Sequence, residues 1–150
     1  MDLILWRHAE AEPGEPDMGR RLTGKGAKQA ERMSAWLDAH LPDTCRILVS
    51  PADRAQQTAQ ALNRKFKTVA ELAPGASVAA VLAAANWPES REPVLIVGHQ
   101  PTLGNVAAFL LSGEGADWAV KKGAVWWLSN RVRDGESGVV LRVVLGPDFV

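Results

Sequence analysis

The sequence predicts an α/β fold, a three-layer α/β/α sandwich with a mostly parallel central sheet. Two observations carry this prediction: short, nearly continuous apolar runs typical of strands buried on both faces, and amphipathic segments that separate them. Strands that alternate with helices favour a largely parallel sheet covered by helices on both faces. A length of 150 residues suits one such unit, so we expect a single domain over residues 1–150.

Four apolar runs are expected to form the main strands, at residues 3–6, 46–49, 93–97 and 124–128. Because apolar residues in these runs barely alternate with polar ones, we expect both faces of each strand to be buried. Two peripheral strands complete the prediction: a closing antiparallel strand at the sheet edge over residues 139–144, and a short one over residues 68–71.

Four helices are expected between these strands. Thr23 is a suitable N-cap for the first, whose apolar positions run at helical spacing through residues 30–41. The second combines Ser50 as N-cap with Pro51 at the first helical position. The third and fourth are marked by apolar residues at helical spacing within residues 78–85 and 103–110.

Composition excludes several classes of protein. With 17 basic and 17 acidic residues the formal net charge is zero, which argues against a general nucleic-acid binder. No apolar run of about 18 residues is present, so no membrane span is expected. The first residues lack the basic start of a signal peptide, and the single Cys45 cannot form an internal disulfide. Together these features predict a cytoplasmic protein.

Arginine and histidine follow the ends of three predicted strands. Arg7 and His8 come directly after the first, Arg54 lies one turn into the helix after the second, and His99 follows the third. Ligands of open α/β sheets bind outside the carboxyl ends of the strands, and parallel strands bring those ends to one edge. We therefore expect two arginines and two of the three histidines to meet at that edge.

The position of Arg54 indicates that the ligand is an anion. A cation in the first turn of a helix faces the positive end of the dipole, which costs some tenths of a kcal/mol. A salt bridge to Asp53 or full solvation would explain this residue without a ligand. A phosphate held between Arg7 and Arg54 also explains it, because guanidinium groups match phosphate oxygens in pairs.

The two histidines suggest phosphoryl transfer without a metal. Either one alone would more often be a hydrogen-bonded structural residue. Together with the arginines, one could act as a neutral imidazole nucleophile and a protonated second one could stabilise charge. A metal site built from His8, Glu10 and His99 is the competing reading, but the adjacent Arg7 would repel the ion. We expect no metal and no cofactor.

Four segments resemble the histidine phosphatase superfamily, the phosphoglycerate mutase-like family. They occur in the family's order: an Arg-His segment after the first strand, an Arg-x-Leu-Thr-x-x-Gly element, a Ser-Pro-x-x-Arg-Ala-x-x-Thr-Ala segment and a late Gly-His. In this sequence they occupy residues 3–10, 20–26, 49–59 and 97–99. The resemblance implies a phosphoglycerate mutase-like fold.

The resemblance also implies roles for matching residues. His8 would be the nucleophile that is transiently phosphorylated, with Arg7, Arg54 and His99 completing the phosphate pocket. Further substrate contacts would come from the matching residues Arg20, Thr23 and Gln100. Thr23 has the alternative role of helix cap, and Gln100 that of a surface residue.

One departure from the family pattern bears on the substrate. Many relatives carry an acidic proton donor where this chain has Pro74, and Glu71 is out of register with it. An alkoxide leaving group benefits from such an acid, by about 10²–10⁴-fold in rate, whereas an imidazole leaves readily from phosphohistidine. Ala9 in place of the usual glycine is a second departure, which makes a positive φ there less favourable.

The chain therefore resembles the short, SixA-type phosphohistidine phosphatases. The resemblance implies a phosphatase acting on a histidine phosphotransfer domain in signal transduction. We expect no nucleic-acid or membrane partner, and we take the protein to be a monomer. The short chain leaves little room for an insertion that would cap the pocket, which suits a protein substrate. A small-molecule phosphomonoesterase of the same mechanism and a non-catalytic phosphate-binding module remain as alternatives.

Overall fold

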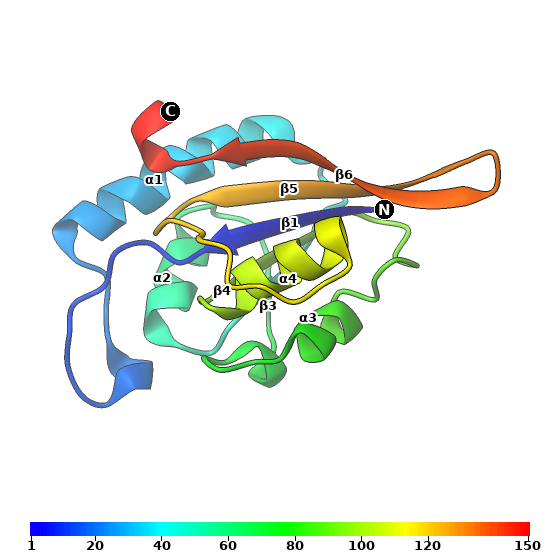
Figure 1. Cartoon of the computed structure of the whole chain (residues 1–150). Coiled ribbons are helices and arrows are strands. Elements are labelled where there is room, and N and C mark those ends of the chain that lie inside the picture. The colour runs from blue at the N-terminus through cyan, green and yellow to red at the C-terminus, as the bar shows by residue number, and fades with distance from the viewer.

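The computed structural model describes all 150 residues as a twisted six-stranded sheet with two helices on each face (Figure 1). The strands are β1 (Asp2–Arg7), β2 (Arg46–Val49), β3 (Lys67–Thr68), β4 (Val94–Gly98), β5 (Val125–Arg133) and β6 (Glu136–Leu145). The helices are α1 (Gly24–His40), α2 (Asp53–Gln60), α3 (Val78–Ala84) and α4 (Thr102–Ser112). Three short 3-10 helices are η1 (Asp17–Gly19), η2 (Ala70–Leu72) and η3 (Pro147–Phe149). None of the four α-helices is long and apolar enough to cross a membrane.

The strand order is β3-β2-β4-β1-β5-β6. The pairs β1–β4, β2–β4 and β2–β3 are parallel, whereas β5 is antiparallel to both β1 and β6. Because β5 reverses direction between them, β6 runs the same way as β1. The carboxyl ends of β1, β2, β4 and β6 therefore lie at one edge of the sheet. The predicted mostly parallel sheet is confirmed, but the strand that opposes the others is β5, and the edge strand β6 is antiparallel only to β5.

Side-chain alternation along β1 divides the core into two halves. Ile4 and Trp6 point into a buried cluster with α1 and α2, while Leu3 and Leu5 point into a second cluster with α3 and α4. All four side chains are fully buried, as expected for a central strand covered on both faces. The arrangement confirms the predicted three-layer sandwich.

Two local predictions differ from the structure. The second helix begins at Asp53 with Ala52 as its N-cap, so Ser50 is not the cap that its sequence context predicts. The hydroxyl of Ser50 forms a hydrogen bond with His99 instead. Residues 50–52 form a short connection between the end of β2 and the start of α2. The short strand covers only Lys67–Thr68, because residues 70–72 turn into η2.

The β5–β6 hairpin is longer than its apolar pattern predicts. It projects beyond the rest of the sheet at the edge opposite the carboxyl end of β1, and turns at Asp134 and Gly135, whose φ values are 52° and 80° (Figure 1). The apolar pattern stops at Leu128 because the strand residues beyond Asn130 are exposed. In this outer part of the hairpin the backbones pair although the side chains are exposed, so hydrophobic periodicity cannot predict these residues as strand.

Candidate active site

The four residues expected at the strand ends do converge. Arg7 and His8 follow the core part of β1, His99 follows β4, and Arg54 lies in the first turn of α2. His8, Arg54 and His99 are 7%, 4% and 4% exposed, so they are packed into the protein. The His8 and His99 rings lie 5.1 Å apart, and the Arg54 Nε atom is 3.4 Å from His8 Nε2.

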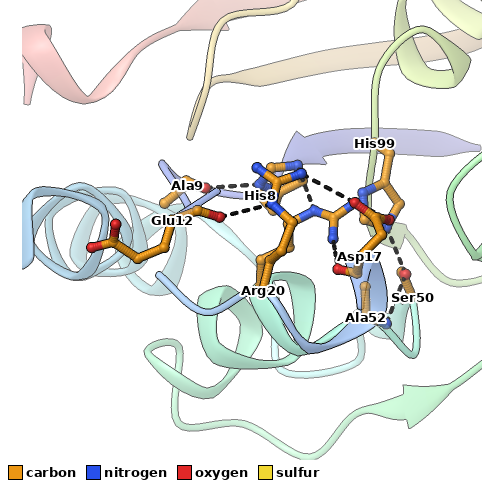
Figure 2. A network of polar contacts seen from close by, with 9 residues as sticks. His8, Ala9, Glu12, Asp17, Arg20, Ser50, Ala52 and His99 are labelled. Atoms are coloured by element: carbon orange, nitrogen blue, oxygen red, sulfur yellow. Dashed lines mark hydrogen bonds and ion pairs between the residues drawn. The ribbon is translucent and has the colours of Figure 1, made fainter. Parts of the chain in front are cut away.

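The hydrogen bonds of His8 define its tautomer. Its Nδ1 atom lies 2.7 Å from the carbonyl oxygen of Ala9, which can only accept, so Nδ1 carries the proton (Figure 2). Its Nε2 atom faces the N–H of Arg54, which can only donate. His8 therefore presents the Nε2 lone pair toward the arginine, the arrangement that a nitrogen nucleophile requires.

His99 is held by Ser50, whose hydroxyl oxygen lies 2.7 Å from His99 Nε2 (Figure 2). The same hydroxyl oxygen accepts the backbone N–H of Ala52 at 3.2 Å. The other ring nitrogen, Nδ1, is buried and has no protein partner. Unpartnered buried polar atoms are rare, so this nitrogen is available to a ligand. Sequence reasoning missed Ser50 in this role, because Ser-Pro before a helix reads equally well as a cap.

The surroundings of both histidines favour the neutral ring. Burial, together with the neighbouring cations Arg54 and Arg7, lowers the pKa of His8 to about 4, against the hydrogen bond to the Ala9 carbonyl oxygen. Burial, followed by the proximity of His8 and Arg54, lowers the pKa of His99 to about 3. Burial and the surrounding cations oppose a positive charge on His99. The protonated second histidine therefore stays a prediction that depends on a bound anion.

Arg7 retains free donor capacity. Its Nη1 atom donates to the carbonyl oxygen of Val120 at 2.8 Å, which fixes the guanidinium against the loop before β5. Its Nε atom is buried without a partner, and burial lowers the pKa of the guanidinium. With His99 Nδ1, this makes two buried polar atoms of the site that lack partners, and both belong to residues expected to bind phosphate.

Asp17 in η1 anchors Arg54, a role that sequence reasoning missed. The Arg54 Nη1 atom donates to the Asp17 carbonyl oxygen at 2.7 Å, and Nη2 lies 3.2 Å from the Asp17 carboxylate. The two terminal nitrogens are thus held by one residue, which leaves Nε directed at His8. An acidic residue three positions before Arg20 in a Pro/Gly-rich loop was the available signal.

Arg20 joins the site from the same loop. Its Nη1 atom lies 3.1 Å from the second oxygen of the Asp17 carboxylate, and its Nε atom donates to the Glu12 carbonyl at 2.7 Å (Figure 2). Arg20 is near enough to His8 to contribute to the lowering of that histidine's pKa. One carboxylate therefore bridges two guanidinium groups beside the two histidines.

Thr58 couples two of the elements that form the site, and its role was also missed. Its hydroxyl donates to the carbonyl oxygen of Arg54 at 2.7 Å and accepts the backbone N–H of Ala9 at 3.1 Å. The end of β1 is thereby tied to α2 beside both His8 and Arg54. The only signal was the position of Thr58 within the 49–59 segment.

Thr23 and Gln100 are engaged in structural hydrogen bonds. The Thr23 hydroxyl caps α1 by accepting the Gly26 N–H at 2.9 Å and donates to Glu10 at 2.8 Å. The side-chain amide of Gln100 donates to the Trp118 carbonyl and accepts the Gly104 N–H. These bonds account for both residues without a substrate contact, because the helix start and the 113–124 loop need these partners.

The site contains no evident proton donor. Asp17 is the one carboxylate within hydrogen-bonding distance of Arg7, His8, Arg54 or His99, and its bonds to Arg20 and Arg54 lower its pKa, so it is ionised. Glu71 is exposed on η2. No group of three or more His, Cys, Asp or Glu side chains is arranged to hold a metal ion. What remains is a cluster of buried arginine and histidine side chains around an imidazole lone pair, with chemistry suited to a tetrahedral oxyanion.

The fold and this cluster of side chains form a candidate anion-binding site at the carboxyl edge of an α/β sheet. Residues 3–77 match the histidine phosphatase superfamily (branch 1), and the chain belongs to that superfamily. It is 34% identical over 126 residues to a protein named phosphohistidine phosphatase SixA homolog from Haemophilus influenzae, covering 73% of this chain and 77% of the relative. It is 32% identical to phosphohistidine phosphatase SixA of Escherichia coli, covering 76% of each.

Solved structures agree with this assignment over nearly the whole chain. A putative phosphohistidine phosphatase SixA from Nakamurella multipartitia superposes with a TM-score of 0.81 at 27% identity, covering 97% of this chain and 95% of the other. A protein histidine phosphatase SixA complexed with tungstate gives 0.76 at 25% identity, covering 99% and 98%. The phosphoglycerate mutase-like fold inferred from four short motifs is thereby confirmed.

Proposed function

We propose that this protein is a metal-independent phosphatase that removes phosphate from protein phosphohistidine through a phospho-His8 intermediate. The observation that carries the proposal is the Nε2 lone pair of a neutral, buried His8 facing the guanidinium of Arg54. The names of the Haemophilus and Escherichia relatives support phosphohistidine as the substrate. The proposed partner is a histidine phosphotransfer domain.

In the first step, His8 Nε2 attacks phosphorus and a P–Nε2 bond forms. The bond from phosphorus to the partner's imidazole breaks, and its electron pair goes to that leaving nitrogen. The Nδ1 proton of His8 remains on the ring, where the Ala9 carbonyl oxygen 2.7 Å away stabilises the resulting positive charge.

In the second step, water attacks phosphorus and the P–Nε2 electron pair returns to His8. The water oxygen and one proton leave with the phosphate, and the other proton goes to solvent. Covalent catalysis of this kind splits one difficult displacement into two easier ones.

The proposed role of Arg7, Arg54 and His99 is to stabilise charge on the transferred group. Arg7 Nε and His99 Nδ1 have no protein partner, and Arg54 Nε–H points at the reacting nitrogen. Donors placed before the reaction begins stabilise developing charge without reorganisation, which is the main requirement of phosphoryl transfer. A bound dianion would also raise the pKa of His99 and allow it to donate.

The absence of a protonated carboxylic acid favours a P–N over a P–O substrate. Asp17 is held ionised by two arginines, so it is a poor source of a proton for a leaving alkoxide. An imidazole leaving group that already carries a proton on its second nitrogen does not need one. The same site would cleave a phosphate ester slowly, because the lack of general acid catalysis would lower the rate by about 10²–10⁴-fold relative to an enzyme that has the acid.

The test is to trap the intermediate. Brief incubation with a ³²P-labelled phosphohistidine protein, followed by alkaline quenching, is expected to leave label on His8, and chelator should not reduce turnover. His8→Ala should lose both label and activity while its circular dichroism is unchanged. His40→Ala, which alters an exposed histidine of α1, is the matched control. Turnover by His8→Ala would overturn the proposal.

A substrate panel separates the alternatives that the sequence left open. Phosphohistidine protein, small phosphoramidates and small phosphate esters should be compared at equal enzyme concentration. Preference for an ester would indicate a small-molecule phosphomonoesterase. Phosphate binding without turnover of any substrate would indicate a binding module.

A further inference from the structure

We propose that a groove beside the phosphate pocket docks the segment of the phosphoprotein that flanks its phosphohistidine. We call it the lysine groove; its wall residues include Arg7, Lys121, Lys122, Trp126, Val144 and Phe149. The inference rests on the proposed function and adds to it the recognition of the protein substrate.

The lysine groove is continuous with the candidate active site. Arg7 lines it and also belongs to the phosphate pocket. The loop that carries Lys121 and Lys122 is bonded to the site at two points: Arg7 donates to the Val120 carbonyl, and the Gly123 N–H donates to the His8 carbonyl at 3.1 Å. A substrate bound in the groove would therefore be positioned relative to the nucleophile.

The opposite wall reaches this position because of strand direction. Since β6 runs parallel to β1, its carboxyl end delivers η3 to the same sheet edge, beside the start of α1 (Figure 1). Pro147 is buried there against Gly123. A Cβ added to Gly123 would lie only 3.2 Å from the proline ring, and the φ of Gly123 is +74°. The two walls are thus packed together and form a built groove.

The chemistry of the groove is both cationic and apolar. Lys121 and Lys122 are exposed and form no ion pair, and Asp148 is the one carboxylate among the groove residues. On the other wall, Phe149 is 83% exposed and Val144 is 49% exposed. The chain as a whole has no net charge, so the groove is more cationic than the molecule on average.

These features specify the occupant as a protein segment that carries a carboxylate and a large apolar side chain close to its phosphohistidine. The carboxylate complements the two lysines, and the apolar side chain would cover Phe149 and Val144. The groove measures about 560 Å³, enough for several side chains. The phosphoryl group itself would bind beside it, at His8 and Arg54. A small phosphoramidate would not extend into it.

The test compares a protein substrate with a small one. Two variants remove the groove's features: Lys121→Gln with Lys122→Gln, and Phe149→Ser. Each should lower kcat/KM for a histidine-phosphorylated phosphotransfer domain by about fivefold to tenfold, mainly through KM, because charged rims steer association and exposed aromatic residues anchor interfaces. Activity toward phosphoramidate should change by less than about twofold, and added salt should reduce only the lysine contribution.

A matched control is Arg131→Gln with Arg133→Gln, which removes two exposed cations from the far hairpin and should leave both substrates unaffected. Equal losses on both substrates, or no loss on the protein, would overturn the docking inference while the proposed function stands. A wild-type enzyme that hydrolyses phosphoramidate but not phosphohistidine protein would refute the proposed function, and the docking inference with it.

Discussion

Two walls of different character enclose the candidate active site. The sheet wall consists of the residues at the ends of β1, β2 and β4 together with the start of α2. It holds His8, Arg54 and His99, all less than 10% exposed. The loop wall consists of residues 11–23, where Asp17 is exposed and Arg20 is half-buried. Both walls place guanidinium groups beside the same histidine, but only the first is part of the core.

The two walls differ in how firmly their functional groups are held. On the sheet wall, the rings of His8 and His99 and the backbone of Arg54 are fixed by backbone or buried side-chain partners, so their geometry is set before a ligand arrives. The terminal nitrogens of Arg54 are the exception, because Asp17 of the loop wall holds them. The loop wall is held to the site by Asp17, whose contacts with Arg54 and Arg20 are open to solvent on one side. We therefore expect substitutions in the sheet wall to have much larger effects than equivalent ones in the loop wall.

The largest difference should appear when one arginine is removed from each wall. Arg54→Gln should lower kcat/KM for phosphoramidate by about 10²–10³-fold, as for other preorganised donors to a transition state. Arg20→Gln should lower it by about tenfold or less, because solvent partly screens this half-buried side chain. Steady-state kinetics on the two purified variants measures both. Equal losses would show that the loop wall is as integral to catalysis as the core.

The packing of the sheet wall can be tested by two glycines in the first turn of α1. An added Cβ at Gly26 would fall on the carbonyl of Glu10, whereas at Gly24 it would meet nothing within 4 Å. Gly26→Ala should destabilise the fold by about 2–4 kcal/mol through overpacking. Gly24→Ala should be neutral or stabilising by up to about 1 kcal/mol. Urea unfolding compares them, and a stable Gly26→Ala would show that α1 can shift away from residues 8–11.

The charge state of the sheet wall should depend on the ligand. In the free protein the pKa of His8 is about 4, so the ring is neutral above that pH and gains a proton only as pH falls through it. Tungstate or phosphate brings negative charge within a few ångströms and should raise this pKa by roughly 1–3 pH units. Nitrogen-15 NMR titration of the imidazoles, assigned with a His40→Gln variant, measures it. An unchanged His8 titration in saturating tungstate would contradict the placement of the anion.

The smallest expected effect concerns the carboxylate that joins the two walls. Asp17→Asn removes the ion pairs to Arg54 and Arg20. The NH2 group of the new amide would face one of the two guanidinium groups, and it cannot accept a hydrogen bond from it. We expect kcat/KM for phosphoramidate to fall by about threefold to tenfold, because Arg54 loses the partner that orients its terminal nitrogens. Asp53→Asn, which alters an exposed carboxylate paired with Arg21 at 3.9 Å, should leave activity unchanged. A rise in activity of Asp17→Asn would mean that Asp17 competes with phosphate.

The sheet wall was also the part that could be predicted. Buried strands produce continuous apolar runs, and the residues that directly follow such a strand lie at the sheet edge. Arg7, His8 and His99 could therefore be placed from the sequence alone. Arg54 followed from the helix start. The loop wall gave no comparable signal, because residues 12–19 are exposed and have no apolar periodicity to fix their path. For that reason Asp17 was missed.

Local patterns with two meanings account for the remaining differences. Ser50 satisfies the rules for a helix cap, but its hydroxyl is recruited by His99, which lies 49 residues further along the chain. Thr23 satisfies both a capping and a substrate-contact pattern, and its hydroxyl is used in the cap and by Glu10. Only the packed structure decides such cases, because the competing partner is distant in sequence.

The sequence by itself determined the sandwich, the direction of most strands and the gathering of arginine and histidine at one edge. Those features depend on hydrophobic periodicity and on the alternation of strands with helices, and both patterns are visible along the chain. The tertiary structure decided the tautomer of His8, the neutral state of both histidines, the anchoring of Arg54 by Asp17 and the lysine groove formed with η3. Each of these arises from burial or from contact between distant segments, and no local pattern encodes it.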